Sequence, residues 1–598
     1  MSKRGPAVEL RPAAPVLEGF VVQTAKPGQR RKAREAVTRV LGREWKVAEF
    51  GDAGTDFEVT LASGQSSRLS SARAWEKTYR LRAEPGILYA EPTFAVPVSG
   101  PPDFRPVEGD GEPRTRGVRS AATRDSAADS GDLPESEDPA WSIAEVKVKE
   151  AWALFPAGIE PGANVVVGHP DTGYVDHPEN VTRLLKNKGH DFVKGDSDAR
   201  DELDTGPGLF PGHGSSTSSV IVSPRGPQAD FGTIKGKAIA VWGVAPGARL
   251  IPFRVSRSVV LNVPWAGGGP SNLAQAIELA ADRGAHVVSI SMGTGFPSSR
   301  LLKAVRYAQR QGVIILAAAG NYIPYVVWPA AYDEVIAVAA SNARRKTWRH
   351  SSNGSAVDVT APGESVWCAG VKDGKPVVGR GSGTSYAVAT VAGVAALWLS
   401  HHGREKLVRR YGAEKIPVIF NQLLRDTCDP VPGWGSDFGR GLVNASRLLS
   451  AELPSTRDAL PNTRALLREH PSIDSGGLAT FRHLFETALP RRRAARATAA
   501  RAAVEDELTV RLASLLGVSE EELPARLNEV GQELAFHFAS DPELFRQFAE
   551  GETGTRPRAA TRGVRAATRS AEGGGQIRAA LLAKGTSAAL KKRLAGGS

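Results

Sequence analysis

The chain has 598 residues, which is too long for one ordinary domain, because chains divide into units of about 100 to 200 residues. Hydrophobic side chains make up 41% of it and charged ones 23%, so most of the chain can form packed cores and is not a disordered polyelectrolyte. Its 76 basic and 64 acidic side chains leave a net charge of +12, which an anionic partner or a basic tail would explain.

The excess positive charge lies at the two ends of the sequence. Residues 1–100 carry 16 basic and 11 acidic side chains, and residues 551–598 carry 10 and 2. The residues between these segments therefore have a net charge of about −1. A central body that is nearly neutral argues against a broad nucleic-acid-binding face.

The sequence gives no sign of a membrane segment or of a cysteine-rich site. The first 20 residues have no apolar stretch of signal-peptide length, and no run of 18 apolar residues occurs. We therefore expect a cytoplasmic protein without membrane contact, with secretion by another route as the alternative. Two cysteines, Cys368 and Cys428, exclude a disulfide scaffold and a cysteine-rich zinc site, and leave a single disulfide open.

Residues 1–138 divide into a tail, a folded unit and a linker. After the tail of residues 1–16, residues 17–97 follow the order strand, helix, strands, helix, strand. This order predicts a small α+β domain. Residues 98–138 are rich in Pro, Gly, Ser and charged side chains and lack apolar periodicity, which predicts a disordered linker open to proteolysis.

Residues 139–452 alternate short apolar runs, such as NVVVGH, HVVSISM and GVIILAAAGN, with helical stretches. Near-continuous apolar runs are typical of strands that are buried on both faces, so we expect a parallel β-sheet flanked by helices. Sheets of this α/β class carry their chemistry at the carboxyl ends of the strands.

The composition then changes to helix formers. Residues 455–550 predict a helical, adaptor-like domain that contacts a protein partner. Residues 491–501 contain five arginines and no acid. Such a stretch is most often a solvated helix face, and the alternative is a surface that binds an acidic partner or nucleic acid. Residues 551–598 are rich in Arg, Gly, Ala and Thr, and predict a basic disordered tail with one short helix, QIRAALLAK.

Four polar positions within residues 139–452 carry groups that nucleophilic chemistry needs. Asp171 follows a buried run, where a carboxylate can orient a histidine, and His213 lies between two glycines. Asn321 ends another buried run, where its amide can donate to an oxyanion. Ser385 precedes an Ala-rich helix, whose positive end favours an anionic intermediate. Taken singly, each position also has a structural explanation, such as a turn residue or a helix cap.

Together these segments resemble the subtilisin-like (subtilase) serine protease family. The motifs are Asp171-Thr172-Gly173, Gly212-His213-Gly214, Asn321 and Gly383-Thr384-Ser385, in this order. The resemblance covers residues 139–449, and SISMG at 289–293, APG at 361–363 and GRGLVNA at 439–445 add to it. It implies the subtilisin-like fold and a serine endopeptidase in which Asp171, His213 and Ser385 form the triad and Asn321 belongs to the oxyanion hole. It implies an acyl-enzyme intermediate, with no cofactor and no catalytic metal.

The resemblance also indicates substrate-binding residues. SISMG is similar to the strand that pairs with the substrate backbone, which implies contacts from Ser289, Ser291, Met292 and Gly293. Val327 and Trp328 lie where relatives form the pocket for the residue before the scissile bond, and would make it narrow and apolar. No acid occurs in this stretch, so a strict preference for cleavage after Arg is not supported. The helix after Ser385 lacks the family's usual Met-Ala-x-Pro, which affects substrate geometry rather than the triad.

Residues 17–97 resemble the subtilase propeptide in their element order and in ending with LYAEPTF. This implies a zymogen with an intramolecular inhibitor, in which residues 91–97 run towards the active site and the linker is cut on maturation. An unrelated α+β binding module is the alternative. The pentapeptide TRGVR occurs at 115–119 and again at 561–565, and is a candidate processing or recognition site.

The sequence leaves two alternatives to an active protease. One is a catalytically silent subtilase fold that serves as a binding scaffold. The other is a protease tethered to nucleic acid through residues 551–598. The acidic loop at 195–204, GDSDARDELD, is a candidate structural calcium site, although a solvated acidic loop is the commoner explanation.

Overall fold

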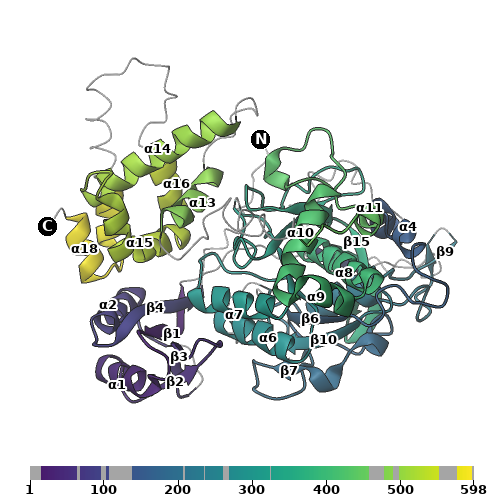
Figure 1. Cartoon of the computed structure of the whole chain (residues 1–598), viewed down its shortest axis with the longest axis horizontal. Helices are drawn as coiled ribbons and strands as arrows, with labels where there is room; N and C mark the ends of the chain where they lie inside the picture. Colours follow the sequence, from purple (N-terminus) through teal and green to yellow (C-terminus); the bar gives the residue numbers. More distant parts are fainter. Residues whose placement is uncertain are drawn as a thin grey trace, which may run out of the picture.

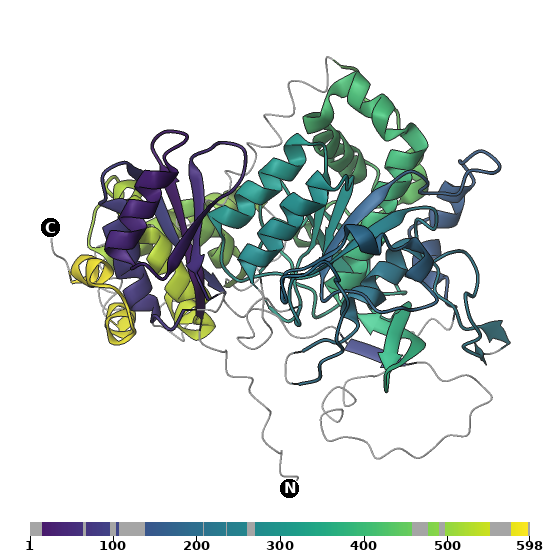
Figure 2. The same cartoon turned by 90° about the horizontal axis from the view of Figure 1, so that it is seen from below.

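The computed structural model describes residues 15–63, 67–95, 103–106, 138–206, 209–234, 236–259, 269–323, 325–456, 477–488, 497–550 and 576–595. An N-terminal domain, a central α/β domain and a C-terminal helical module follow one another along the chain (Figure 1 and Figure 2). Both copies of TRGVR, the arginines at 491–496 and most of the predicted tail and linker lie outside the described residues.

The N-terminal domain is an antiparallel sheet with two helices. Its elements are β1 (Val16–Thr24), α1 (Arg30–Val40), β2 (Trp45–Glu49), β3 (Asp56–Leu61), α2 (Ser71–Arg82) and β4 (Ile87–Ala95). The strands pair in the order β2-β3-β1-β4, and Val37 and Trp75 of the helices are buried in the same core as Phe20 of β1. The predicted α+β order is confirmed. This domain lies beside two helices of the central domain, α6 (Pro270–Asp282) and α7 (Ser299–Arg310) (Figure 2).

The central domain is built on a seven-stranded sheet of order β14-β13-β12-β11-β6-β10-β7, in which the paired strands are parallel. The strands are β6 (Val166–Asp171), β7 (His190–Asp191), β10 (Arg249–Arg254), β11 (Val287–Ile290), β12 (Ile314–Ala318), β13 (Ile336–Ser341) and β14 (Val359–Pro362). The helices are α3 (Trp141–Glu145), α4 (Val148–Trp152), α5 (His213–Val222), α6 (Pro270–Asp282), α7 (Ser299–Arg310), α8 (Thr384–His402), α9 (Arg404–Tyr411), α10 (Ile416–Asp426) and α11 (Ala445–Ser450). A separate two-stranded ribbon pairs β8 (Thr233–Ile234) with β9 (Lys237–Ala238). The predicted parallel sheet flanked by helices is confirmed.

Successive residues on the central strands belong to different cores. On β12, Ile315 and Ala317 pack in the core that α6 and α7 share with the N-terminal domain. Ile314 and Leu316 pack instead with α5 and α8. Because side chains alternate across a strand, a strand that is covered on both faces needs apolar residues at every position. The apolar runs in the sequence therefore reflect helices on both faces of the sheet.

A short strand lies within the segment predicted to be a disordered linker. β5 (Asp103–Pro106) pairs antiparallel with β16 (Lys375–Ser382), which pairs in turn with β15 (Val366–Lys372). The linker prediction is wrong for these four residues, because the backbone of β16 supplies the hydrogen-bonding partners that the local sequence does not signal. The pairing of Asp103 with Ser382 brings the linker to within a few residues of Ser385.

The C-terminal module consists of α13 (Leu478–Ala488), α14 (Ala497–Leu516), α15 (Leu523–Ala539), α16 (Pro542–Glu550), a helix over 576–583 and α18 (Ala588–Leu594). The short helix predicted for QIRAALLAK is confirmed at residues 576–583, whereas the prediction of a disordered tail is wrong for residues 585–595, which include α18. Ile577 and Leu581 are four residues apart, as are Leu590 and Leu594, so each pair lies on one helix face and is buried. The Ser587 hydroxyl caps α18 by accepting from the N–H of Leu590 at 3.2 Å.

Both cysteines are buried free thiols, so the single disulfide that the sequence left open is not formed. Burial raises the pKa of Cys368 to about 12, and burial together with Asp429 raises the pKa of Cys428 to about 12. Among the described residues, no helix is both long enough and apolar enough to cross a membrane.

Candidate active site

Asp171 and His213 form a buried hydrogen-bonded pair. Asp171 ends β6 and His213 begins α5, so that both lie at the carboxyl edge of the sheet. His213 Nδ1 lies 2.7 Å from Asp171 Oδ1. Gly214 permits this approach, because a Cβ at that position would lie 2.0 Å from the carbonyl oxygen of Gly173. The glycine after the histidine is therefore required by the packing of α5 against the turn that follows β6.

The surroundings of Asp171 keep its carboxyl ionised. Oδ1 accepts from the N–H of Thr172 at 2.7 Å, and Oδ2 accepts from the Thr217 hydroxyl at 3.3 Å. Burial by itself would raise the pKa of Asp171, but His213, through its charge and hydrogen bond, lowers it overall, with further help from His169 and Thr172. A carboxylate here requires the imidazole proton to be on Nδ1, which leaves Nε2 as an acceptor.

Ser385 lies next to this pair, at the start of a helix. It is the second residue of α8, and the ring centroid of the following residue, Tyr386, is 6.4 Å from that of His213. The Ser385 hydroxyl donates to the carbonyl oxygen of Ser291 at 3.4 Å. His213 Nε2 makes no hydrogen bond with the described part of the chain. In this structure the Ser385 hydroxyl therefore bonds Ser291, and His213 Nε2 is left without a hydrogen bond to the described residues.

Asn321 is held in one orientation by Thr384. Its Oδ1 accepts from both the N–H and the hydroxyl of Thr384, at 2.9 and 2.8 Å. Two donors on one atom identify that atom as the oxygen, so the donor Nδ2 is the end left for another group. The N–H of Ser385 lies in the first turn of α8, where backbone N–H groups have no intrahelical acceptor. These two donors suit an oxyanion hole.

The predicted substrate strand needs one correction. The end of β11 is followed by Ser291, Met292 and Gly293. The hydrogen bond from the Ser385 hydroxyl to the carbonyl oxygen of Ser291 places this segment beside Ser385. Ser289 is instead inside β11, paired with Leu316 of β12 and fully buried. Its side chain therefore cannot contact a substrate, because the sheet and the covering helices enclose it.

The two predicted pocket residues have different surroundings. Val327 lies against the backbone of Gly293, since a Cβ on Gly293 would be 2.5 Å from Val327 Cγ2. Trp328 is fully buried, and its ring centroid is 5.0 Å from that of His483 on α13. His483 Nε2 also hydrogen-bonds the carbonyl oxygen of Val326 at 2.7 Å. The loop that the sequence assigned to the pocket is therefore held by the C-terminal module.

Sequence reasoning missed three supporting residues. Thr384 lies inside the Gly-Thr-Ser motif, and its position directly before Ser385 is a sequence signal that could have identified it as a supporting residue. Thr217 is four residues after His213, so it lies on the same face of α5. His483 carries no local signal, because it lies 155 residues from Trp328 in sequence and meets it only through the tertiary fold.

The acidic loop at 195–204 surrounds an arginine. Arg254, the last residue of β10, is buried and lies 3.0 Å from Asp191 Oδ2 and 3.2 Å from Glu202 Oε2. Asp204 lies 3.8 Å from the same guanidinium. Among the described residues, no group of three or more His, Cys, Asp or Glu side chains is placed to hold a metal ion. Glu202 and Asp204 of this loop, together with Asp191, are thus engaged by Arg254.

Comparisons with known proteins decide the family. The model of the subtilase family matches residues 162–441. Subtilisin Savinase from Lederbergia lenta is 30% identical over 306 residues, which cover 51% of this chain and 96% of that protein. The chain belongs to the subtilase family.

Other relatives show which parts of this subtilase are shared. The thermophilic serine proteinase of Bacillus sp. (strain AK1) is 31% identical over 310 residues, which are 52% of this chain and 63% of that protein, slightly under two thirds of its length. The crystal structure of fervidolysin from Fervidobacterium pennivorans, a keratinolytic enzyme related to subtilisin, aligns with a TM-score of 0.51 at 23% identity. It covers 75% of this chain and 63% of that one, and supports the fold. The family match ends at residue 441, so the C-terminal module of this subtilase lies beyond it.

Proposed function

We propose that this subtilase is a serine endopeptidase whose substrates are polypeptides. The observation that carries the proposal is the 2.7 Å contact of His213 Nδ1 with the ionised Asp171, which leaves Nε2 without a hydrogen bond to any described residue. This arrangement sets the imidazole to accept one proton from a serine hydroxyl. Every group that the chemistry needs is supplied by the chain's own side chains and backbone.

The reaction follows from the roles of these groups. His213 Nε2 takes the proton of Ser385 as Oγ attacks the substrate carbonyl, and Asp171 stabilises the imidazolium. The oxyanion accepts from Asn321 Nδ2 and from the N–H of Ser385. Collapse of the tetrahedral intermediate breaks the C–N bond, and His213 protonates the leaving amine. Water then attacks the acyl-enzyme, gives its proton to His213 and releases the acid, with Ser385 regenerated.

Asn321→Ala tests this proposal. Loss of one preorganised oxyanion donor should lower kcat about 10²- to 10³-fold with little change in KM, because the donor acts mainly on the transition state. The measurement is hydrolysis of a fluorogenic peptide by protein whose linker has been cut and whose N-terminal domain has been removed. Absence of hydrolysis by the wild-type chain in that form would rule out the endopeptidase.

We also propose that the N-terminal domain inhibits the enzyme. Two of its acidic side chains reach helix N-termini of the central domain, where backbone N–H groups lack an intrahelical acceptor. Glu91 Oε1 on β4 accepts from the N–H of Ser299 at the start of α7, at 2.7 Å. Glu18 Oε2 on β1 accepts from the N–H of Ser271 at the start of α6, at 3.4 Å.

Charged side chains add to the same interface. Asp56 pairs with Lys303, Glu58 lies 3.7 Å from Arg300, and Asp52 pairs with Arg310 at 2.5 Å. The acidic partner belongs to the N-terminal domain in each pair, and the basic partner belongs to α7. Acidic side chains of the N-terminal domain thus face basic side chains along α7. Such charge complementarity fixes the position of the domain on the catalytic body, as inhibition requires.

Glu18 makes this contact depend on pH. Burial raises the pKa of Glu18 to about 8, and Glu58 adds to the effect, while the N–H of Ser271 opposes it. The interface between the N-terminal domain and α6 therefore favours the protonated form of Glu18. The stabilisation of the interface by this protonated acid is complete below pH 4.5 and is lost as the pH rises through about 8. In Ser385→Ala protein with its linker cut, we expect the N-terminal domain to dissociate faster near pH 9 than near pH 6.

Gel filtration of the cut protein across this pH range measures the effect. Glu18→Gln is the matched control, because its amide keeps the size of the side chain and does not titrate. The dependence should flatten in this variant. An equally steep dependence in Glu18→Gln would assign the effect to another group.

A further inference from the structure

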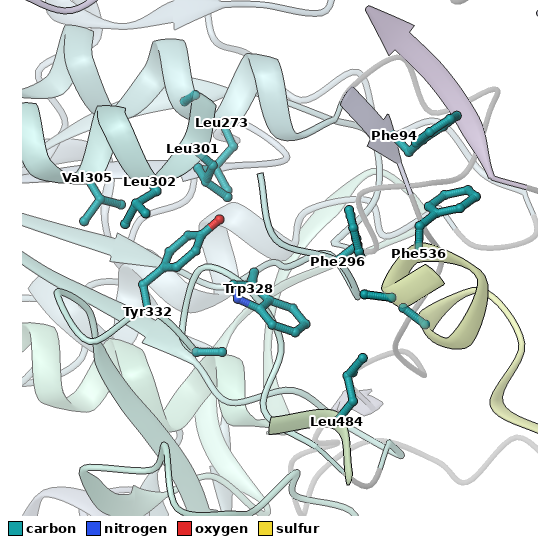
Figure 3. Packing of buried hydrophobic residues seen from close by; sticks show 14 of the residues in the cluster. Phe94, Leu273, Phe296, Leu301, Leu302, Val305, Trp328, Tyr332, Leu484 and Phe536 are labelled. Atoms are coloured by element: carbon teal, nitrogen blue, oxygen red, sulfur yellow. The ribbon is translucent and has the colours of Figure 1, made fainter. Parts of the chain in front are cut away.

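The C-terminal module contacts both the N-terminal domain and the loops around the active site. Figure 1 places α15 and α18 beside α2 and β4, and Figure 3 shows Phe94, Phe296 and Phe536 gathered where the three parts meet. These residues belong to the N-terminal domain, the central domain and the module, respectively. The module therefore lies at the junction between the predicted inhibitor and the catalytic body.

Phe536 of α15 forms the apolar part of this junction. Its ring stacks on that of Phe94 at the end of β4, with centroids 4.3 Å apart and an interplanar angle of 28°. It also meets Trp75 of α2 at 6.0 Å and Phe296 at 5.8 Å, both edge to face. Its neighbour Phe538 instead meets Phe481, Phe545 and Phe548 inside the module. Phe536 thus belongs to a docking face rather than to the module's own core.

Gln532 and Glu533 form the polar part. Gln532 Nε2 donates to Glu91 Oε2 at 2.6 Å, and its Oε1 accepts from Arg82 Nη2 at 2.7 Å. Glu533 is fully buried, and it accepts from the Tyr79 hydroxyl at 2.9 Å. Buried hydrogen bonds of this kind fix the register of an interface, because each unpaired partner would lose its solvation without compensation.

Glu91 links this docking face to the catalytic body. One carboxylate oxygen accepts from the start of α7 and the other from Gln532, so a single side chain is bound by both parts. On the other side of the junction, His483 of α13 bonds the carbonyl oxygen of Val326 and packs on Trp328. The module is therefore bonded to the inhibitor and to the pocket loop at the same time.

From these contacts, and resting on the proposed inhibition, we propose that the face of α15 made by Gln532, Glu533 and Phe536 is a docking surface for the chain's own N-terminal domain. The linker of residues 98–138 is the only covalent connection from that domain to the catalytic body. A cut in the linker leaves the N-terminal domain held by noncovalent contacts alone. Some of these contacts are made by α15, and the module that carries α15 stays covalently attached to the catalytic body through residues 457–476. The cut enzyme stays latent until this module releases the domain.

The experiment places a recognition sequence for an added protease in the linker of Ser385→Ala protein, so that retention is measured without self-cleavage. After cutting, the amount of N-terminal fragment that co-elutes with the body is followed over time. We expect Gln532→Ala with Phe536→Ala to speed fragment release at least about tenfold, because two hydrogen bonds and a ring stack are removed. Gln547→Ala is the matched control, since that side chain bonds Glu543 within the module.

The outcomes separate the two proposals. Equal release rates in the docking variant and in Gln547→Ala would overturn the docking surface, whatever the activity. Gln532→Ala alone provides the test if the double variant unfolds, as judged by circular dichroism. In protein with Ser385 intact, the cut docking variant should hydrolyse peptide at least about tenfold faster than the cut wild type. Hydrolysis by neither protein after the fragment has been removed would instead overturn the endopeptidase.

Discussion

Replacing Ser385 with alanine is expected to lower kcat for peptide hydrolysis about 10⁶-fold, the size of loss found when the nucleophile of subtilisin is removed. The protein should keep its stability, because the hydroxyl makes one long hydrogen bond, at 3.4 Å to the carbonyl oxygen of Ser291. The measurement is initial-rate kinetics at saturating substrate, together with thermal unfolding, on protein freed of its N-terminal domain.

Ser400→Ala is the matched control for this variant. Ser400 lies on the same helix, α8, and donates to the carbonyl oxygen of Ala163 at 2.9 Å, far from the chemistry. Its kcat should equal that of the wild type. Residual hydrolysis by Ser385→Ala within tenfold of the wild type would mean that another group is the nucleophile.

Replacing Asp171 with asparagine is expected to lower kcat about 10⁴-fold with a small change in KM. An amide cannot stabilise the imidazolium as a carboxylate does, and its N–H₂ group favours the wrong imidazole tautomer. The normal carboxyl is held ionised by His213, which lowers its pKa against the effect of burial. Steady-state kinetics on the same peptide measure the loss.

Thr217→Val provides the control for the environment of Asp171. It removes the hydroxyl that donates to Asp171 Oδ2 at 3.3 Å and keeps the shape of the side chain. We expect a loss of about tenfold or less, since only the contacts of one neutral hydroxyl are removed, among them those with Asp171 Oδ2 and with His169 Nε2 at 3.0 Å, and the charge of Asp171 stays. A loss as large as that of Asp171→Asn would indicate that both variants act by disturbing α5.

The contact of Asp171 with His213 could be predicted because both residues lie at points that a parallel sheet brings together. Asp171 and Asn321 each follow a buried apolar run, and the carboxyl ends of parallel strands share one edge. The expectation that Ser289 contacts substrate is wrong because β11 continues to Ile290, and only the later residues of SISMG leave the sheet. The boundary of a short strand is not encoded in its own apolar pattern.

The features that the sequence did not reveal depend on distant partners. β5 forms because β16 offers an edge, and its four residues have no alternation of their own. The helix α18 buries Leu590 and Leu594 against the module, within a composition otherwise typical of a tail. The contact of His483 with Trp328 joins segments that no local periodicity relates. Each of these is a tertiary effect on a weak local signal.

Covalent labelling tests the central claim most directly. Wild-type chain, freed of its N-terminal domain, is treated with a fluorophosphonate, digested and mapped by mass spectrometry. The account predicts a single adduct on the Oγ of Ser385, because only a serine next to an acceptor Nε2 is activated for this attack. No adduct, or an adduct at another residue with Ser385 unmodified, would contradict it.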